Sequence, residues 1–194
     1  MRAVRLIWSM LGYDAGWIAC VLAASSGRWW LSLPAVLVIV VIHIALAPRP
    51  KREVLSILVV TAIGACADSA LAAMSLISLN AHPGLSLPFV LWIAALWANF
   101  APLLTTLLAW FRRHLVLATL LGATSAPVAY FGASKLGAIE IAQPQSILYA
   151  AVAVEYAILL PLLLLISGRI TAPQERPREA SGTSHTEPTN TGTS

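Results

Sequence analysis

Charged residues are scarce in this sequence. Asp, Glu, Lys and Arg make up only 10% of its 194 residues, whereas hydrophobic residues make up 59% and the mean hydropathy is +0.82. Soluble domains carry about 25% charged residues, so this composition excludes a soluble globule. The length and the composition together indicate a single-domain integral membrane protein.

Cysteine and histidine are also too few, and too scattered, to build a site. Cys20 and Cys66 both lie in hydrophobic stretches without a paired spacing, so we interpret them as small packing residues rather than a disulfide framework. The four histidines are His43, His82, His114 and His185. Because no Cys/His cluster has metal-ligand spacing, the sequence predicts neither a metal site nor a cofactor.

Long hydrophobic runs, in contrast, are abundant. Six stretches approach the roughly 20 apolar residues that a helix needs to cross the hydrocarbon core. They cover residues 6–26, 30–47, 54–79, 87–110, 115–134 and 146–168. The runs are continuous rather than alternating, which argues against the strands of a membrane barrel. We therefore predict an all-α, polytopic membrane helix bundle of about six transmembrane helices within residues 1–170.

The distribution of basic residues predicts the orientation of this bundle, because cytoplasmic loops retain Lys and Arg. With the N-terminus inside, ten of the twelve basic residues are cytoplasmic, and only Arg28 and Lys135 lie in outward loops. The sequence thus predicts an N-in, C-in protein. The net charge of +4 is a signal of topology, and we expect no nucleic-acid partner.

Both ends of the chain carry further signals. Residues 2–25 share features with a secretory signal peptide, and residues 17–20 with a lipoprotein cleavage box. Asp14 interrupts the apolar region and Trp17 replaces the expected Leu, so we expect this first helix to be retained. Residues 171–194 are rich in Thr, Ser, Pro and Glu, which predicts a disordered cytoplasmic tail.

Three of the eight acidic residues lie near the middle of hydrophobic stretches: Asp14, Asp68 and Glu155. A charge at the centre of a bilayer costs about 2.5–3.5 kcal/mol on insertion scales, so such a residue usually faces the protein interior. One interpretation is a protonated carboxyl that hydrogen-bonds neighbouring helices. The other is a site for a proton, a metal cation or a cationic substrate, since no Lys or Arg is expected at the same depth.

Asp68 is the strongest functional candidate because its surroundings are small and polar. Residues three and four apart share one helix face. That face comprises Thr61, Gly64, Ala65, Asp68, Ala72 and Ser75. Asn99 lies near the centre of the next hydrophobic stretch, where an amide needs partners, and Tyr130 lies about one turn beyond Pro127. We therefore predict a midplane polar cluster of Asp68, Asn99, Glu155 and Tyr130.

Four segments carry a resemblance to a known family. They are residues 16–22 (GWIACVL), 63–69 (IGACADS), 91–100 (LWIAALWANF) and 127–138 (PVAYFGASKLGA). The chain resembles, over residues 5–168, an uncharacterised bacterial family of small multi-pass inner-membrane proteins, classed as a domain of unknown function. It departs from the family pattern at Tyr13 and Asp14. The resemblance implies the bacterial inner membrane and, from the family's genomic neighbours, a link to envelope lipid metabolism.

Three functions remain open from the sequence. The first is a small transporter, or a transport component, that binds a solute at the midplane cluster. The second is a membrane-embedded, lipid-modifying enzyme with Asp68 or Glu155 as general acid or base. The third is an assembly partner in envelope lipid metabolism, with small-residue faces for packing. The expected partners are membrane lipids and a second copy of the chain or another envelope protein.

Overall fold

The computed structural model describes residues 2–172, which form an all-α bundle, as the sequence predicts. The predicted tail lies outside the described residues, except for Thr171 and Ala172. The α-helices are α1 (Arg2–Ser25), α2 (Ser32–Ala45), α3 (Pro50–Ala73), α4 (Leu87–Thr105), α5 (Leu115–Lys135) and α6 (Gln145–Thr171). The 3₁₀ helices are η1 (Trp29–Leu31) and η2 (Leu107–Arg113), and the strands are β1 (Ile77–Leu79) and β2 (Ile139–Ile141).

Five of these helices are long and apolar enough to cross a membrane: α1, α3, α4, α5 and α6. The predicted span at residues 30–47 is the exception, because it divides into η1 and the 14-residue α2. Together they form a continuous apolar segment, Trp29–Ala45, that is shorter than the other five. Five spans are therefore clear from length and composition.

Local signals in the sequence explain where several helices end. Gly27 and Gly137 adopt positive φ angles of 71° and 76° directly after α1 and α5. The next amides, of Arg28 and Ala138, donate back to the carbonyls of Ala23 and Ala133, the pattern of a glycine-terminated helix. These two turns let the chain reverse at the end of each helix.

Two predicted helices are shorter in the structure. In the predicted stretch 54–79, the helix ends at Ala73, and Ser75, two residues later, has a positive φ of 58° that turns the chain away. Its last residues form β1, which pairs antiparallel with β2 so that Ile77 faces Ile141 and Leu79 faces Ile139. The stretch 87–110 likewise ends its α-helix at Thr105, where both Thr105 and Thr106 donate to the carbonyl of Pro102.

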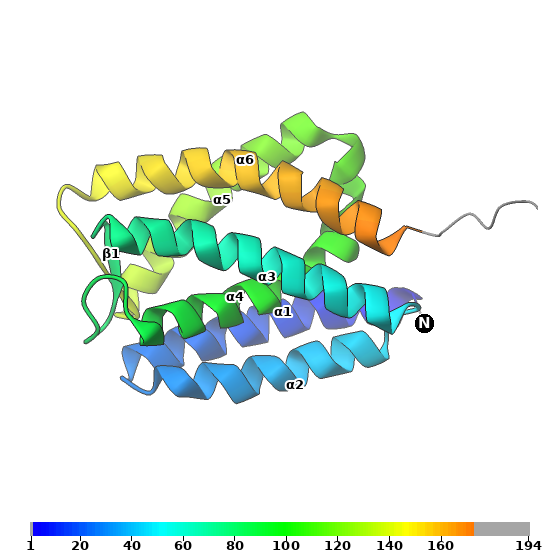
Figure 1. Cartoon of the computed structure of the whole chain (residues 1–194), viewed down its shortest axis with the longest axis horizontal. Coiled ribbons are helices and arrows are strands. Elements are labelled where there is room, and N and C mark those ends of the chain that lie inside the picture. Colours follow the sequence, from blue (N-terminus) through cyan, green and yellow to red (C-terminus); the bar gives the residue numbers. More distant parts are fainter. Residues whose placement is uncertain (1, 173–194) are drawn as a thin grey trace, which may run out of the picture.

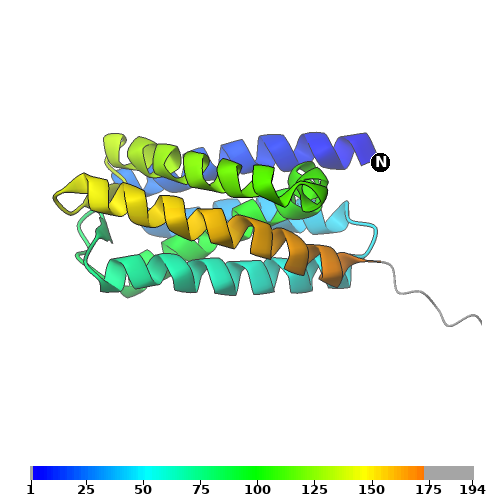
Figure 2. The same cartoon turned by 90° about the horizontal axis from the view of Figure 1, so that it is seen from above.

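The six α-helices run along the long axis of the molecule in alternating directions (Figure 1). The N-terminus and the end of α6 lie at one end of the bundle, and β1 and β2 lie at the other, which we call the strand end. α4 is the central helix, because it packs against α1, α2, α3 and α6. α5 packs mainly on α6 and lies toward the same side as α1 in the view from above (Figure 2).

Small residues let these helices approach closely. The predicted small and polar face of α3 does turn inward: Gly64, Ala65, Asp68 and Ala72 are buried, although Ser75 is exposed. A Cβ atom at Gly64 would overlap the indole of Trp97, so α3 and α4 can meet here only through a glycine. Close packing of this kind replaces the hydrophobic drive within lipid.

Two glycines of α5 provide a matched test of this packing. A Cβ at Gly122 would overlap the carbonyl oxygen of Tyr156 on α6, whereas a Cβ at Gly132 would meet only Trp17, at 3.6 Å. We predict that Gly122→Ala destabilises the protein by about 1–3 kcal/mol through overpacking. Gly132→Ala should be neutral or slightly stabilising, because alanine has the higher helix propensity. Thermal unfolding of both variants in detergent measures the difference, and equal midpoints would contradict it.

Candidate functional site

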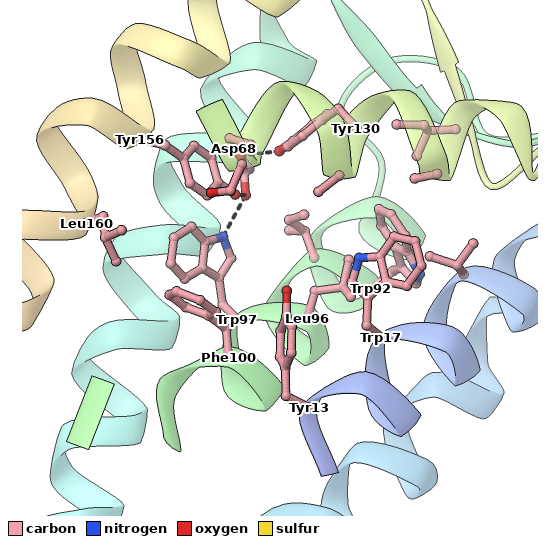
Figure 3. Close-up of a pocket in the computed structure, with 17 residues that line it drawn as sticks. Tyr13, Trp17, Asp68, Trp92, Leu96, Trp97, Phe100, Tyr130, Tyr156 and Leu160 are labelled. Carbon is pink, nitrogen blue, oxygen red and sulfur yellow. Dashed lines mark hydrogen bonds between the residues drawn. The ribbon is translucent and has the colours of Figure 1, made fainter. Parts of the chain in front are cut away.

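The Asp68 carboxylate receives hydrogen bonds from three different helices. Trp97 Nε1 on α4 donates to Oδ2 over 2.6 Å, and Tyr156 Oη on α6 donates to the same oxygen over 3.2 Å. Tyr130 Oη on α5 donates to Oδ1. Asp68 is fully buried on α3, so these donors replace the water that the carboxylate has lost. Figure 3 shows the side chain between Tyr130 and Trp97.

The same side chains form the wall of a cavity of about 130 Å³. Seven aromatic residues line it: Tyr13, Trp17, Trp92, Trp97, Phe100, Tyr130 and Tyr156. Trp97 and Tyr156 are stacked, with ring centroids 5.4 Å apart, and Tyr130 meets Tyr156 edge to face at 6.3 Å. The walls of the cavity are therefore predominantly π surfaces.

One charged side chain faces this aromatic space. Among the residues that line the cavity, Asp68 is the only Asp or Glu, and none is Lys, Arg or His. A carboxylate only accepts hydrogen bonds and an indole N–H only donates them, so Trp97 donates a hydrogen bond to Asp68. The arrangement therefore places negative charge beside the negative faces of aromatic rings, a combination that attracts cations.

The structure brings together only two of the four residues in the predicted midplane cluster. Asp68 and Tyr130 are hydrogen-bonded and both line the cavity. Asn99 is buried but lies outside the cavity lining: its Nδ2 donates over 2.9 Å to the carbonyl of Tyr13, and Gly16 lies against its amide. Asn99 therefore holds α4 against α1.

Glu155 also lies outside the cavity lining, although it is adjacent in sequence to Tyr156. Both of its carboxylate oxygens are enclosed, and neither has a hydrogen-bond partner within residues 2–172. Asp14, the third acidic residue at this depth, is exposed on α1. The three acids in hydrophobic stretches thus have different environments. Asp68 accepts hydrogen bonds from three side chains, Glu155 is enclosed without a hydrogen-bond partner among the described residues, and Asp14 is exposed on the surface of α1.

Sequence reasoning missed the two donors that complete the Asp68 site. They are Trp97 and Tyr156, which are not members of the predicted cluster although both line the cavity and donate hydrogen bonds to the carboxylate. The available signal was the hydrogen-bonding capacity of indole and phenol groups at membrane depth, which must find an acceptor. The sequence does not show which acceptor they find.

A second polar cluster joins four helices at the end of the bundle that carries the N-terminus. Glu53, near the start of α3, is 3% exposed and pairs with Arg5 of α1 over 2.7 Å. His43 Nε2 of α2 lies 2.9 Å from Glu53 Oε1, and Thr105 of α4 donates to the same oxygen. His43 is fully buried, and Ser9 contacts its other ring nitrogen over 3.3 Å.

The fold and the site together define a helical membrane protein with an aromatic-lined cavity beside one buried carboxyl group. The chain belongs to the family described as proteins of unknown function, DUF2878, whose model matches residues 6–162. No curated protein and no solved structure matches the chain. The family match covers every element from α1 to most of α6, but it assigns no activity.

The cluster around Glu53 leads to a stability prediction. We expect Glu53→Ala to destabilise the protein by about 2–4 kcal/mol, because it leaves the partly buried charge of Arg5 without its counter-charge. Unfolding of the purified protein in mixed micelles measures this loss. Glu140→Ala, which removes an exposed acid on β2, is the matched control and should change stability little.

A double variant separates lost pairing from lost packing. Arg5→Met combined with Glu53→Leu replaces the pair with apolar side chains of similar size, which is often neutral. It should recover most of the stability that Glu53→Ala loses. A double variant as unstable as Glu53→Ala would show that the pair does more than neutralise its own charges.

Proposed function

We propose that this protein binds a small organic cation within the membrane, as a transporter or as a component of one. The observation that carries the proposal is the position of Asp68: the one charged side chain among seven aromatic residues that line the cavity. A carboxylate supplies the counter-charge, and the ring faces supply cation–π attraction of about 0.5–2 kcal/mol each. Quaternary and alkylated ammonium groups are the ligands that such surroundings suit.

The size of the cavity sets the size of the ligand. Its volume is about 130 Å³, close to that of an apolar protein cavity of roughly 150 Å³ that binds benzene. A tetramethylammonium-sized group therefore fits. A ligand of this size would contact Trp97, Tyr130 and Tyr156, which line the cavity.

The contacts of Asp68 favour binding over the alternative of lipid-modifying chemistry. A general acid or base must exchange a proton with a substrate within hydrogen-bond reach. The two oxygens of Asp68 already accept three hydrogen bonds, from Trp97, Tyr130 and Tyr156. That donor set holds the carboxylate in place as a fixed negative charge, which is what recognition of a cation requires.

The proposed setting is a bacterial cytoplasmic membrane, with six crossings and both described chain ends on the cytoplasmic side. The alternating helix directions and the shared end of the termini support this topology (Figure 1). The segment formed by η1 and α2 would span about 27 Å at the usual rises per residue. That is close to the hydrocarbon thickness of about 30 Å, and a small mismatch costs little.

Tetramethylammonium binding tests the proposal. Trp17, Trp92 and Trp97 line the cavity, so their fluorescence should change in a saturable way when the purified protein is titrated in an uncharged maltoside detergent. Asp68→Asn should weaken binding about tenfold or more, since 1.4 kcal/mol of lost attraction is a factor of ten.

Glu155→Gln is the matched control, because it removes an enclosed carboxyl that does not line the cavity. Its affinity should stay within about threefold of wild type, a difference of well under 1.4 kcal/mol. Size-exclusion profiles establish that each variant is folded. A folded Asp68→Asn protein that binds as tightly as wild type would refute the proposed site, and uptake of labelled tetramethylammonium into proteoliposomes would then test transport alone.

A further inference from the structure

Where α1 and α5 border the cavity, several of the residues that line it are only partly covered by the protein. α1 packs against α2 and α4, and α5 packs against α6, but α1 and α5 are not among the closely packed helix pairs. Tyr13 and Trp17 line the cavity from α1, while Ser125 and Ala129 line it from α5. Ser125 is an exposed residue even though it lines the cavity. We call this partly uncovered border, from Tyr13 and Trp17 to Ser125 and Ala129, the mouth of the cavity.

This mouth lies at mid-depth in the two helices. Tyr13 stands near the middle of the 24-residue α1, and Ser125 stands in the middle of the 21-residue α5. At 1.5 Å per residue, each is about 15–18 Å from the ends of its helix. Half of the hydrocarbon thickness is about 15 Å, so the mouth faces lipid tails rather than water. The surface around the mouth is consistent with contact with lipid, since it exposes apolar side chains: Met10 is 49% and Val128 is 70% exposed.

Toward the strand end, the mouth narrows and the cavity closes. A Cβ at Gly132 of α5 would lie 3.6 Å from the indole of Trp17, so the two helices come near each other there. Beyond that point, Ile139 of β2 and Val21 of α1 line the cavity and are buried. In Figure 3, Tyr13 and Trp17 project from α1 on the side of the cavity opposite α5.

Asp14 lies beside this mouth. It is exposed and directly follows Tyr13, and it is spaced three and seven residues from Trp17 and Val21, which line the cavity. Residues at these spacings share one face of a helix. Exposing a carboxyl group to lipid at the middle of a membrane helix costs free energy, so a residue of this kind usually has a function. Asp14 and Asp68 thus place one acidic group outside the mouth and one inside the cavity.

We propose that the cavity receives its ligand from the bilayer through the opening between α1 and α5, and that this ligand is an amphiphile with a cationic headgroup and an alkyl chain. The inference rests on the proposed binding of an organic cation at Asp68. The headgroup occupies the aromatic cavity, which has no room for a long chain, and the chain leaves through the mouth into the lipid. Asp14 offsets the charge of the headgroup while it passes the hydrocarbon.

A series of alkyltrimethylammonium ions tests the position of the chain. Tetramethyl-, hexyltrimethyl- and dodecyltrimethylammonium carry the same headgroup, and each is titrated against the purified protein in a maltoside detergent. The dodecyl ion should bind at least tenfold more tightly than the tetramethyl ion. The same series with Asp68→Asn corrects for partition of the chain into the micelle, because that contribution is the same for both proteins.

Two neighbouring substitutions on α5 provide the decisive comparison. Ser125→Trp fills the mouth and should abolish the gain in affinity that chain length gives. Thr124→Trp places the same side chain on an exposed neighbour that does not line the cavity, and it should keep the full gain. A dodecyltrimethylammonium ion with a diazirine in mid-chain should label α1 or α5 near Tyr13 and Ser125.

The charge of Asp14 has its own measurement. Asp14→Asn should slow the association of the dodecyl ion about tenfold, since 1.4 kcal/mol of lost attraction along the path is a factor of ten. Asp14→Glu, which keeps the charge, should restore the rate. Equal association rates for the wild type, Asp14→Asn and Asp14→Glu would show that Asp14 has no role in the entry of the ligand.

The outcomes distinguish this inference from the proposed function. Tetramethylammonium binding that does not depend on Asp68 refutes the proposed function, and the inference with it. Asp68-dependent binding without a gain from chain length, or with a gain that Ser125→Trp leaves intact, refutes only the lateral opening and the amphiphile. Labelling confined to residues far from α1 and α5 does the same.

Discussion

The hydrogen bonds to the Asp68 carboxylate are the constraint on which the rest of the structure depends. A carboxylate in the hydrocarbon region must find partners inside the protein, because lipid offers none. Its donors come from α4, α5 and α6, so three helices must converge on α3 at one level. The convergence also turns the aromatic rings of those donors toward a common space. The cavity is therefore a direct consequence of satisfying Asp68.

The two ends of the bundle are closed by different means, and this confines the open space to the middle. At the end that carries the N-terminus, Glu53 joins Arg5, His43 and Thr105 and thereby ties α1, α2, α3 and α4 together. At the strand end, β1 and β2 bury Ile77, Leu79 and Ile139. α5 takes no part in that cluster and is not among the helices closely packed on α1, which supports the proposed opening along that side.

The sequence could predict the helices because hydrophobic length and continuity are local properties. It could also predict that Asp68 lies on an inward face, since the spacing of Gly64, Ala65 and Ala72 is visible in the chain. The hydrogen-bond partners of Asp68 could not be predicted from the sequence. Trp97 and Tyr156 are 29 and 88 positions away from Asp68 in the chain, and only tertiary packing brings them together. Glu53 was missed for a related reason, because an acid near the end of a predicted span looks solvated until Arg5 and His43 are placed beside it.

The donors around Asp68 bear on whether this residue is structural or functional. Hydrogen bonds alone would be consistent with a residue that only holds the helices together. A site with that role would be more stable if the side chains around it were packed at the usual density of a protein interior. Here the rings of Trp97, Tyr130 and Tyr156 instead border a space of about 130 Å³. Glu155, one residue from Tyr156, shows the contrasting case of an enclosed carboxyl without partners and outside that space. The combination of a hydrogen-bonded acid and an unfilled aromatic volume is what supports the proposed binding site over a simple helix contact.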